Sequence, residues 1–179
     1  MPSGSVALNA GAAPALVVLD TNVVLDWLLF RNAGCDPLID AVTQRRVEWT
    51  ATEAMLTELD HVLGRPALSA WRPDRQAINA ACRRWVRVVE PVAALPHAPA
   101  LCCRDHDDQM FIDLARQLTL APLQRTGPPD HQPVAGSPIV SLVTRDRALL
   151  ALGRRSRLCA IEITPPERWQ LREPTDLTR

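Results

Sequence analysis

The sequence predicts an α/β domain with three layers, α/β/α, in which helices cover both faces of a mostly parallel sheet of four or five strands. Two observations lead to this prediction. Short apolar, β-branched runs alternate with helical patterns along the chain, and no internal repeat interrupts them. The length of 179 residues and the hydrophobic fraction of 47% suit one globular domain and exclude intrinsic disorder. We expect this single domain to span residues 15–172.

Three strands and four helices are predicted in the first half of the chain, after a flexible lead at residues 1–14. The strands are short apolar runs, at residues 15–19, 47–51 and 86–90. The helices are apolar throughout or carry apolar residues at helical spacing, in residues 23–30, 37–44, 53–63 and 74–85. Thr50 and Glu53 form a capping-box pattern at the third helix, and Gly64 marks its end.

The second half of the chain continues the alternation after a loop. Strands are expected at residues 139–144 and 160–164, and helices at residues 105–120, 147–152 and 167–171. Residues 122–138 are rich in Pro and Gly, which predicts a long insert without regular structure. Because such an insert leads into a strand, we expect it on the face opposite the carboxyl ends of the strands. Residues 173–179 are expected to form a C-terminal tail.

Composition excludes several classes of function. The chain has no Lys, so all 20 of its basic residues are Arg. P-loop NTPases, Schiff-base enzymes and PLP enzymes all need a Lys and are therefore excluded. Five Cys without disulfide spacing favour a reduced, cytoplasmic protein. No apolar run is long enough to cross a bilayer, so no membrane partner is expected.

Acidic residues follow the predicted strands, at the edge where the carboxyl ends of parallel strands meet. Asp20 closes the first strand, and Asp146 follows the strand at 139–144. Further acids begin the helix after the third strand or lie on the helix after the second: Asp105, Asp107, Asp108 and Glu58. One Asp after a strand is usually a turn former or a helix cap. Several carboxylates in one crevice repel each other, by on the order of several kcal/mol per pair.

A divalent cation is the natural counter-charge for such a cluster, since the chain has no Lys. All-oxygen ligands favour Mg²⁺ or Mn²⁺ over zinc, and such ions serve chemistry at phosphoryl oxygens. The remaining acids on helices are expected to be solvated: Asp26, Asp40, Asp60 and Asp74.

Four segments together resemble a PIN domain. They are VLDTNVVLD at 18–26, LTELDHVLGRP at 56–66, CRDHDDQMFIDLA at 103–115 and LVTRDRALL at 142–150. Their order and spacing most resemble the PIN branch described as toxins of toxin–antitoxin systems. The resemblance covers about residues 16–168 and implies a metal-dependent endoribonuclease with an α/β/α fold.

The resemblance also implies roles for individual residues. The catalytic carboxylates match Asp20, Glu58, Asp108 and Asp146. The metal ligands match Asp20, Asp108 and Asp146, with Asp105 as a further acid. Polar residues that orient a carboxylate or a water match Asn22 and Thr144. The sequence departs from the pattern at Arg145, where Gly is common, and at His106, where Pro is common.

Two basic segments flank the acidic residues and suit an RNA backbone. Residues 65–87 hold six Arg and one Asp, and residues 145–157 hold five Arg and one Asp. The candidate RNA contacts are Arg65, Arg104, Arg145 and Arg147. Trp71 and Trp85 could stack on bases, although Trp85 falls on an apolar helical stripe that favours burial.

The leading hypothesis is therefore an endoribonuclease toxin that uses Mg²⁺ or Mn²⁺, acts in the cytoplasm, and is held by an antitoxin protein. Homodimers are common in the family, so a second copy is a candidate partner. One alternative is a non-cleaving RNA- or protein-binding module on the same fold. Another is an aspartyl-phosphate enzyme with Asp20 as nucleophile, but such enzymes need a second Asp where Asn22 stands.

Overall fold

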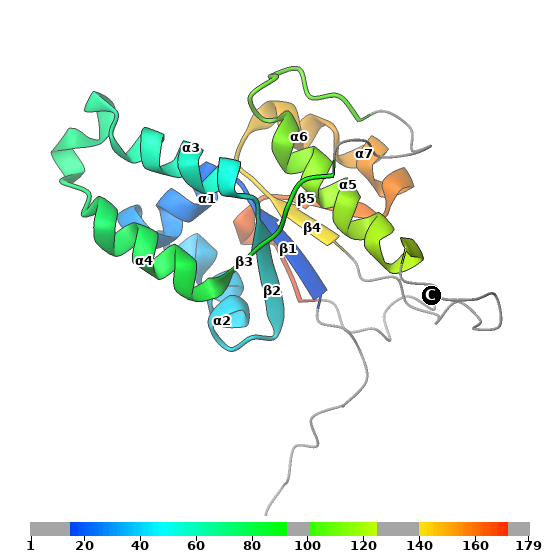
Figure 1. The fold of residues 1–179 in the computed structure, drawn as a ribbon, viewed down its shortest axis with the longest axis horizontal. Helices are drawn as coiled ribbons and strands as arrows, with labels where there is room; N and C mark the ends of the chain where they lie inside the picture. The colour runs from blue at the N-terminus through cyan, green and yellow to red at the C-terminus, as the bar shows by residue number, and fades with distance from the viewer. Residues whose placement is uncertain (1–14, 93–100, 125–139, 172–179) are drawn as a thin grey trace, which may run out of the picture.

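Five parallel strands form the centre of the molecule. The computed structural model describes residues 15–92, 101–124 and 140–171. The strands are β1 (Ala15–Leu19), β2 (Val47–Ala51), β3 (Val86–Val88), β4 (Val140–Val143) and β5 (Ile161–Thr164), in the order β3-β2-β1-β4-β5. Helices cover both faces of this sheet, which gives the three-layer α/β/α architecture in Figure 1. The predicted fold class is confirmed.

The helices of the described residues alternate with the strands. The α-helices are α1 (Thr21–Leu25), α2 (Asp36–Thr43), α3 (Glu53–Leu63), α4 (Arg75–Trp85), α5 (Gln109–Gln124), α6 (Arg147–Ala151) and α7 (Gly153–Ser156). A π-helical turn, η1 (Asp26–Phe30), extends α1. The 3₁₀ turns are η2 (Ala33–Cys35), η3 (Pro66–Trp71), η4 (Arg157–Cys159) and η5 (Pro166–Arg168).

The chain reverses its direction of travel across the sheet at β1. From β1 it moves outward to β2 and β3, and it then returns to place β4 on the other side of β1. The sheet therefore has its topological switch point between β1 and β4, where ligands bind in open α/β sheets. The register pairs Leu19 with Val143, so the residues after β1 and after β4 leave the sheet at the same level.

β1 and β4 lie at the centre of the sheet and are largely buried. All four residues of β4 are buried, as are the last three of β1. Apart from Ser141, their side chains are apolar, as expected of parallel strands covered on both faces. The core continues into α5 through Phe111, Ile112 and Leu114, which are each 2% exposed or less. This rigid centre fixes the backbone on either side of the switch point.

Several local predictions were wrong. Helix α3 is capped by Thr52, whose hydroxyl accepts from the Met55 amide at 3.4 Å, so Thr50 is not the cap. Helix α5 begins at Gln109 because residues 104–108 form bends and a turn. The final helix is only the 3₁₀ turn η5. Asp26 is only 8% exposed and is therefore not solvated, and its carboxylate forms an ion pair with Arg145.

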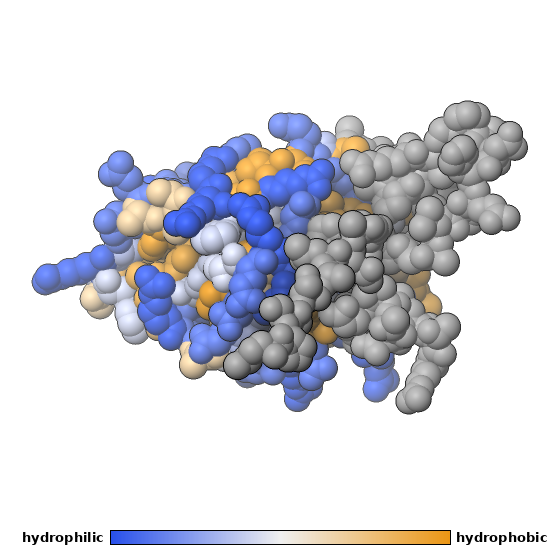
Figure 2. Space-filling model, turned by 90° about the horizontal axis from the view of Figure 1, so that it is seen from below, coloured by the Kyte–Doolittle hydropathy of each residue, from blue (hydrophilic) through white to orange (hydrophobic). Residues whose placement is uncertain are grey.

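Other predictions fall on parts of the chain outside the described residues. These are the flexible lead at 1–14, the tail at 173–179 and most of the insert at 122–138, of which residues 122–124 belong to α5. Among the described residues, no helix has the length and apolar character needed to cross a membrane. On the face shown in Figure 2, hydrophilic residues interrupt the hydrophobic ones across the described surface.

Candidate active site

Asp20 lies at the switch point and is held there from two directions. Its backbone amide donates to the carbonyl of Val143 at 3.0 Å, so the chain stays attached to β4 one residue after β1 ends. Its carboxylate accepts a 2.6 Å hydrogen bond from the hydroxyl of Thr144, which is fully buried. Asn22 adds two longer contacts at 3.5 Å, from its backbone and side-chain nitrogens. Asp20 is itself 2% exposed, and this burial raises its pKa.

Thr144 connects Asp20 to a second carboxylate. While its hydroxyl donates to Asp20, the same oxygen accepts from the backbone amide of Asp146 at 2.9 Å. Asp146 in turn caps α6, since its Oδ1 accepts from the amides of Ala148 and Leu149 at 2.7 and 3.0 Å. A cap of this kind fixes the side-chain rotamer. One buried hydroxyl thus sets the relative placement of two carboxylates that are 126 positions apart in the sequence.

Glu58 reaches the site from α3. Its Oε2 accepts from the hydroxyl of Thr21 at 3.3 Å, and Thr21 is the residue directly after Asp20. Partial burial is the main reason why the pKa of Glu58 is raised, and the charge of Asp20 raises it further. The guanidinium of Arg65 has the opposite effect on the Glu58 carboxyl, so Arg65 lies on this side of the site.

Asp108 lies in the turn before α5 and adds a further carboxyl group to the site. Burial raises its pKa to about 6, and the charges of Asp20, Asp146, Asp105 and Glu58 raise it further, in that order. All of these acids lie in reach of one another's fields, although they come from four separate parts of the chain. Arrays of this kind, in which neighbours raise a carboxyl pKa, are typical of functional sites.

The donor atoms suit a hard divalent cation, but the side chains do not enclose one. Within the described ranges, no three His, Cys, Asp or Glu side chains are grouped closely enough to hold a metal ion. Oxygen atoms from Asp20, Asp108 and Asp146 are nevertheless the ligands that Mg²⁺ and Mn²⁺ prefer. The charges of the neighbouring acids add to burial in raising the pKa of Asp108, and a bound cation would relieve this repulsion. These three carboxylates thus suit a divalent cation by the chemistry of their oxygen atoms and by their negative charge.

Arg145 occupies a different position from the one that its sequence neighbourhood suggests. Its guanidinium forms ion pairs with Asp26 of η1 and Glu167 of η5. The ion pair with Arg145 compensates the negative charge of Asp26, so this carboxylate can be buried. The other candidate RNA contacts, Arg65, Arg104 and Arg147, are exposed. Sequence patterns do not indicate the contacts of Thr21 and Asp26, because their partners lie 37 and 119 positions away.

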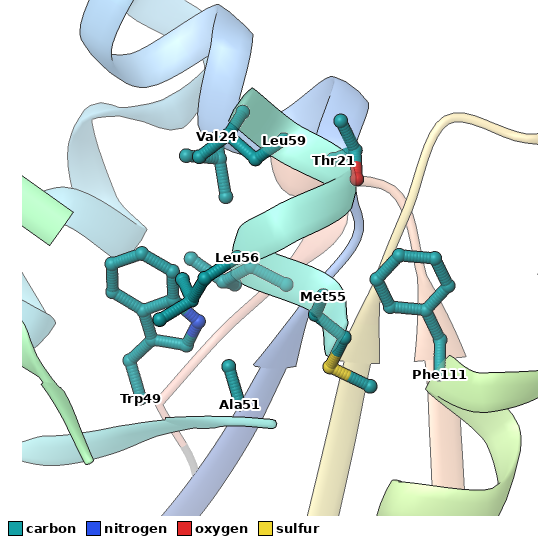
Figure 3. A pocket seen from close by; sticks show the side chains of 9 residues that line it. Thr21, Val24, Trp49, Ala51, Met55, Leu56, Leu59 and Phe111 are labelled. Carbon is teal, nitrogen blue, oxygen red and sulfur yellow. The ribbon is translucent and has the colours of Figure 1, made fainter. Parts of the chain in front are cut away.

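A small apolar cavity lies beneath the acidic edge. Figure 3 shows Met55, Leu56 and Leu59 of α3 around it, together with Phe111 of α5 and Trp49 of β2. Its volume of about 10 Å³ is at the lower limit for a single water. Thr21 also lines it, beside the Glu58 contact. The cavity is too small for a substrate, so the site lies on the open edge above it.

Comparisons with known proteins identify the family of this chain. A model of the PIN domain family matches residues 16–121, a region that includes Asp20, Glu58 and Asp108 and ends before Asp146. One similar solved structure is the PIN domain of RRP44 from T. brucei, with 15% identity, 85% of this chain and 76% of that chain covered, and a TM-score of 0.48. A search of curated proteins found no match. The family model spans more than half of the chain, and the protein belongs to the PIN domain family.

Proposed function

We propose that this protein is a metal-dependent endoribonuclease that hydrolyses RNA phosphodiester bonds. PIN domains are generally nucleases, which sets the general class of activity. The observation that carries the proposal is the convergence of acids at the switch point, where neighbouring carboxylates contribute to raising the pKa of Asp108 to about 6. Without a counter-charge, the repulsion between clustered carboxylates lowers the stability of the folded protein. A function that requires these negative charges explains why the cluster is present.

The proposed roles follow from the contacts of each side chain. Asp20, Asp108 and Asp146 would hold Mg²⁺ or Mn²⁺, with Asp105 as a further acid nearby. The bound ion would lower the pKa of its water and stabilise charge on the phosphoryl oxygens. Burial raises the pKa of Asp20, and the hydrogen bond from Thr144 orients that carboxyl and offsets part of the rise.

Glu58 and Asn22 complete the proposed acidic edge. Glu58 is positioned by Thr21 and would orient the ion or its water. Asn22 is exposed next to Asp20, where its backbone N–H donates to Oδ1 of the carboxylate and its side-chain amide donates to Oδ2, each at 3.5 Å. The products would carry a 5′-phosphate and a 3′-hydroxyl.

The basic residues that remain available suit an RNA backbone. Arg65, Arg104 and Arg147 are exposed near the acidic edge. We leave Arg145 out of the proposed RNA contacts, because Asp26 and Glu167 already neutralise its charge. Arginines around an acidic centre favour phosphates at the rim and a cation at the middle.

The biological setting that we propose is a toxin of a toxin–antitoxin pair, acting in the cytoplasm. The order of the acidic motifs supports the toxin branch of the family, and the five free cysteines support a reducing compartment. The antitoxin would be a separate protein, and a second copy of the chain is a further candidate partner. Co-expression with the neighbouring open reading frame, followed by co-purification, tests the first partner directly.

The test of the activity is cleavage of a mixed RNA pool with Mn²⁺ or with EDTA. We expect the wild type to cleave only with Mn²⁺, and Asp20→Asn to be inactive while remaining folded, because the buried Asp20 is replaced by a neutral group of the same shape. Asp40→Asn, an exposed carboxylate on α2, is the matched control and should cleave normally. RNA binding without any cleavage by the wild type would favour the non-cleaving module instead.

A further inference from the structure

We infer that Phe30 and Trp71 form a stacking platform for an unpaired base of single-stranded RNA, to one side of the acidic edge. The inference rests on the proposed ribonuclease function and goes further, because it names the form of the substrate and the residues that would recognise it. Four observations support it: a paired but exposed aromatic, two flanking arginines, the course of the chain toward Glu58, and the local charge.

The aromatic pair joins two segments that are distant in the sequence. Phe30 ends η1 and Trp71 ends η3, and their ring centroids are 4.8 Å apart at an interplanar angle of 68°. Phe30 packs against the core, whereas Trp71 is 57% exposed. The indole thus packs against a partly buried neighbour that contacts the core, while much of its own surface faces solvent. A fixed, exposed indole is the element that base stacking requires.

An arginine directly follows each of the two aromatics. Arg31 and Arg72 both adopt a left-handed backbone, with φ of 55° and 45°. Glycine is the usual residue at such helix ends, so arginine here keeps a cation at a conformational cost. Both side chains are exposed, and neither takes part in an ion pair with another described residue. Each of the two paired rings is thus directly followed in the sequence by an exposed cation, and we expect these cations to contact the phosphates next to a stacked base.

The chain leads from this platform to the acidic edge. η3 begins after Arg65, whose charge acts on the Glu58 carboxyl. The six residues of this 3₁₀ turn, at about 2.0 Å each, place Trp71 roughly 10 Å from its start. That length corresponds to about three stacked nucleotides at ~3.4 Å each. In Figure 1 the link between α3 and α4, which contains η3, forms the left end of the molecule.

Charge and the scarcity of exposed apolar anchors favour RNA over a protein helix at this surface. Of the six Arg in residues 65–87, three form ion pairs with acids of neighbouring elements, so among the described residues the cations left without an ion pair are Arg65, Arg72 and Arg84. A helix bound in a groove needs several apolar anchors in a row. In the described part of the chain the large hydrophobics that are exposed are Trp71 on η3, Leu158 on η4 and Val92 in the loop after β3, so they do not form a row. A single indole among arginines suits a base and its phosphates better.

The experiment measures binding of a fluorescent 12-nucleotide RNA by anisotropy, in EDTA so that no cleavage occurs. Trp71→Ala should weaken binding of the single strand between about 5- and 100-fold, as expected for one lost stacking contact, and Trp71→Phe should restore most of it. Binding of an abasic strand of the same length should be equal for wild type and Trp71→Ala. Leu158→Ala is the matched control, because it removes an exposed apolar side chain that also neighbours an arginine, and it should bind as the wild type does.

Three results would overturn the inference. They are unchanged binding of the single strand by Trp71→Ala, an equal loss for the abasic strand, and absence of RNA binding by the wild type, in which case this surface serves a protein partner. Thermal unfolding of both Trp71 variants separates a loss of the fold from a loss of stacking. Because the assay contains no metal, stacking can be supported while cleavage fails, or refuted while cleavage succeeds, so the two proposals are tested separately.

Discussion

Asp108 destabilises the metal-free protein at neutral pH, and Asp108→Asn should relieve this cost. Its pKa is about 6 in the folded protein, against an ordinary value of 3.8. At about 1.36 kcal/mol per pH unit, this difference corresponds to roughly 3 kcal/mol for a fully shielded group. Asp108 is only half-buried, so solvent screening reduces the expected gain to about 1 kcal/mol.

The sign of the effect follows from proton binding. Between pH 3.8 and about 6 the folded state holds the Asp108 proton while the unfolded state has lost it, so stability falls as the pH rises through this window. The neutral Asn does not titrate. The difference between Asp108→Asn and the wild type should therefore be near zero below pH 3.8 and reach its full value above pH 6.

The assay is thermal unfolding in EDTA at several pH values from 3.5 to 8. A gain of about 1 kcal/mol raises the midpoint by ~2–4 °C in a domain of this size. Asp40→Asn on α2 serves as the control for loss of an exposed negative charge and should show no such dependence on pH. If Asp108→Asn were equally stable or less stable than the wild type at pH 7.5, Asp108 would not lie in a repulsive field and the acidic edge would not exist as described.

Three further predictions concern residues around the site. Thr144→Val removes the hydrogen bond that lowers the Asp20 pKa, so the acid limb of the pH–rate profile for cleavage should move to higher pH; an unchanged limb would contradict the role of Thr144. Arg145→Met leaves Asp26 buried without its cation and should cost roughly 2–4 kcal/mol in urea unfolding, and a neutral result would refute the ion pair. Burial raises the pKa of Cys82 to about 11, so its thiol should resist Ellman's reagent until the protein unfolds, and rapid reaction would show that α4 opens.

Sequence patterns were sufficient for the sheet because its strands are short apolar runs bounded by polar residues. The predicted ranges 15–19 and 47–51 coincide with β1 and β2. Asp20 and Asp146 could be placed near each other from the sequence, since Asp20 directly follows β1 and Asp146 comes three residues after the end of β4. The start of α5 was predicted four residues too early because acidic residues favour the first turn of a helix, whereas here residues 104–108 form bends and a turn.

Contacts between distant segments were beyond the reach of sequence patterns. Nothing local to Arg145 indicates that its guanidinium turns toward Asp26 and Glu167, and a pattern of alternating elements does not show such a pairing. The pairing of Phe30 with Trp71 has the same origin, since the two rings are 41 positions apart. The periodicity and composition of the sequence indicate which face of a helix or strand a residue occupies. Only the folded structure shows which of these faces pack against each other.

The central claim is that the acids at the switch point bind a divalent cation, and Mn²⁺ titration followed by electron paramagnetic resonance tests it most directly. The wild type should bind Mn²⁺ saturably at pH 7.5, while Asp20→Asn and Asp146→Asn should lose this binding and Asp40→Asn should retain it. Binding of Mn²⁺ by Asp20→Asn with the affinity of the wild type, or no binding by the wild type, would contradict the account.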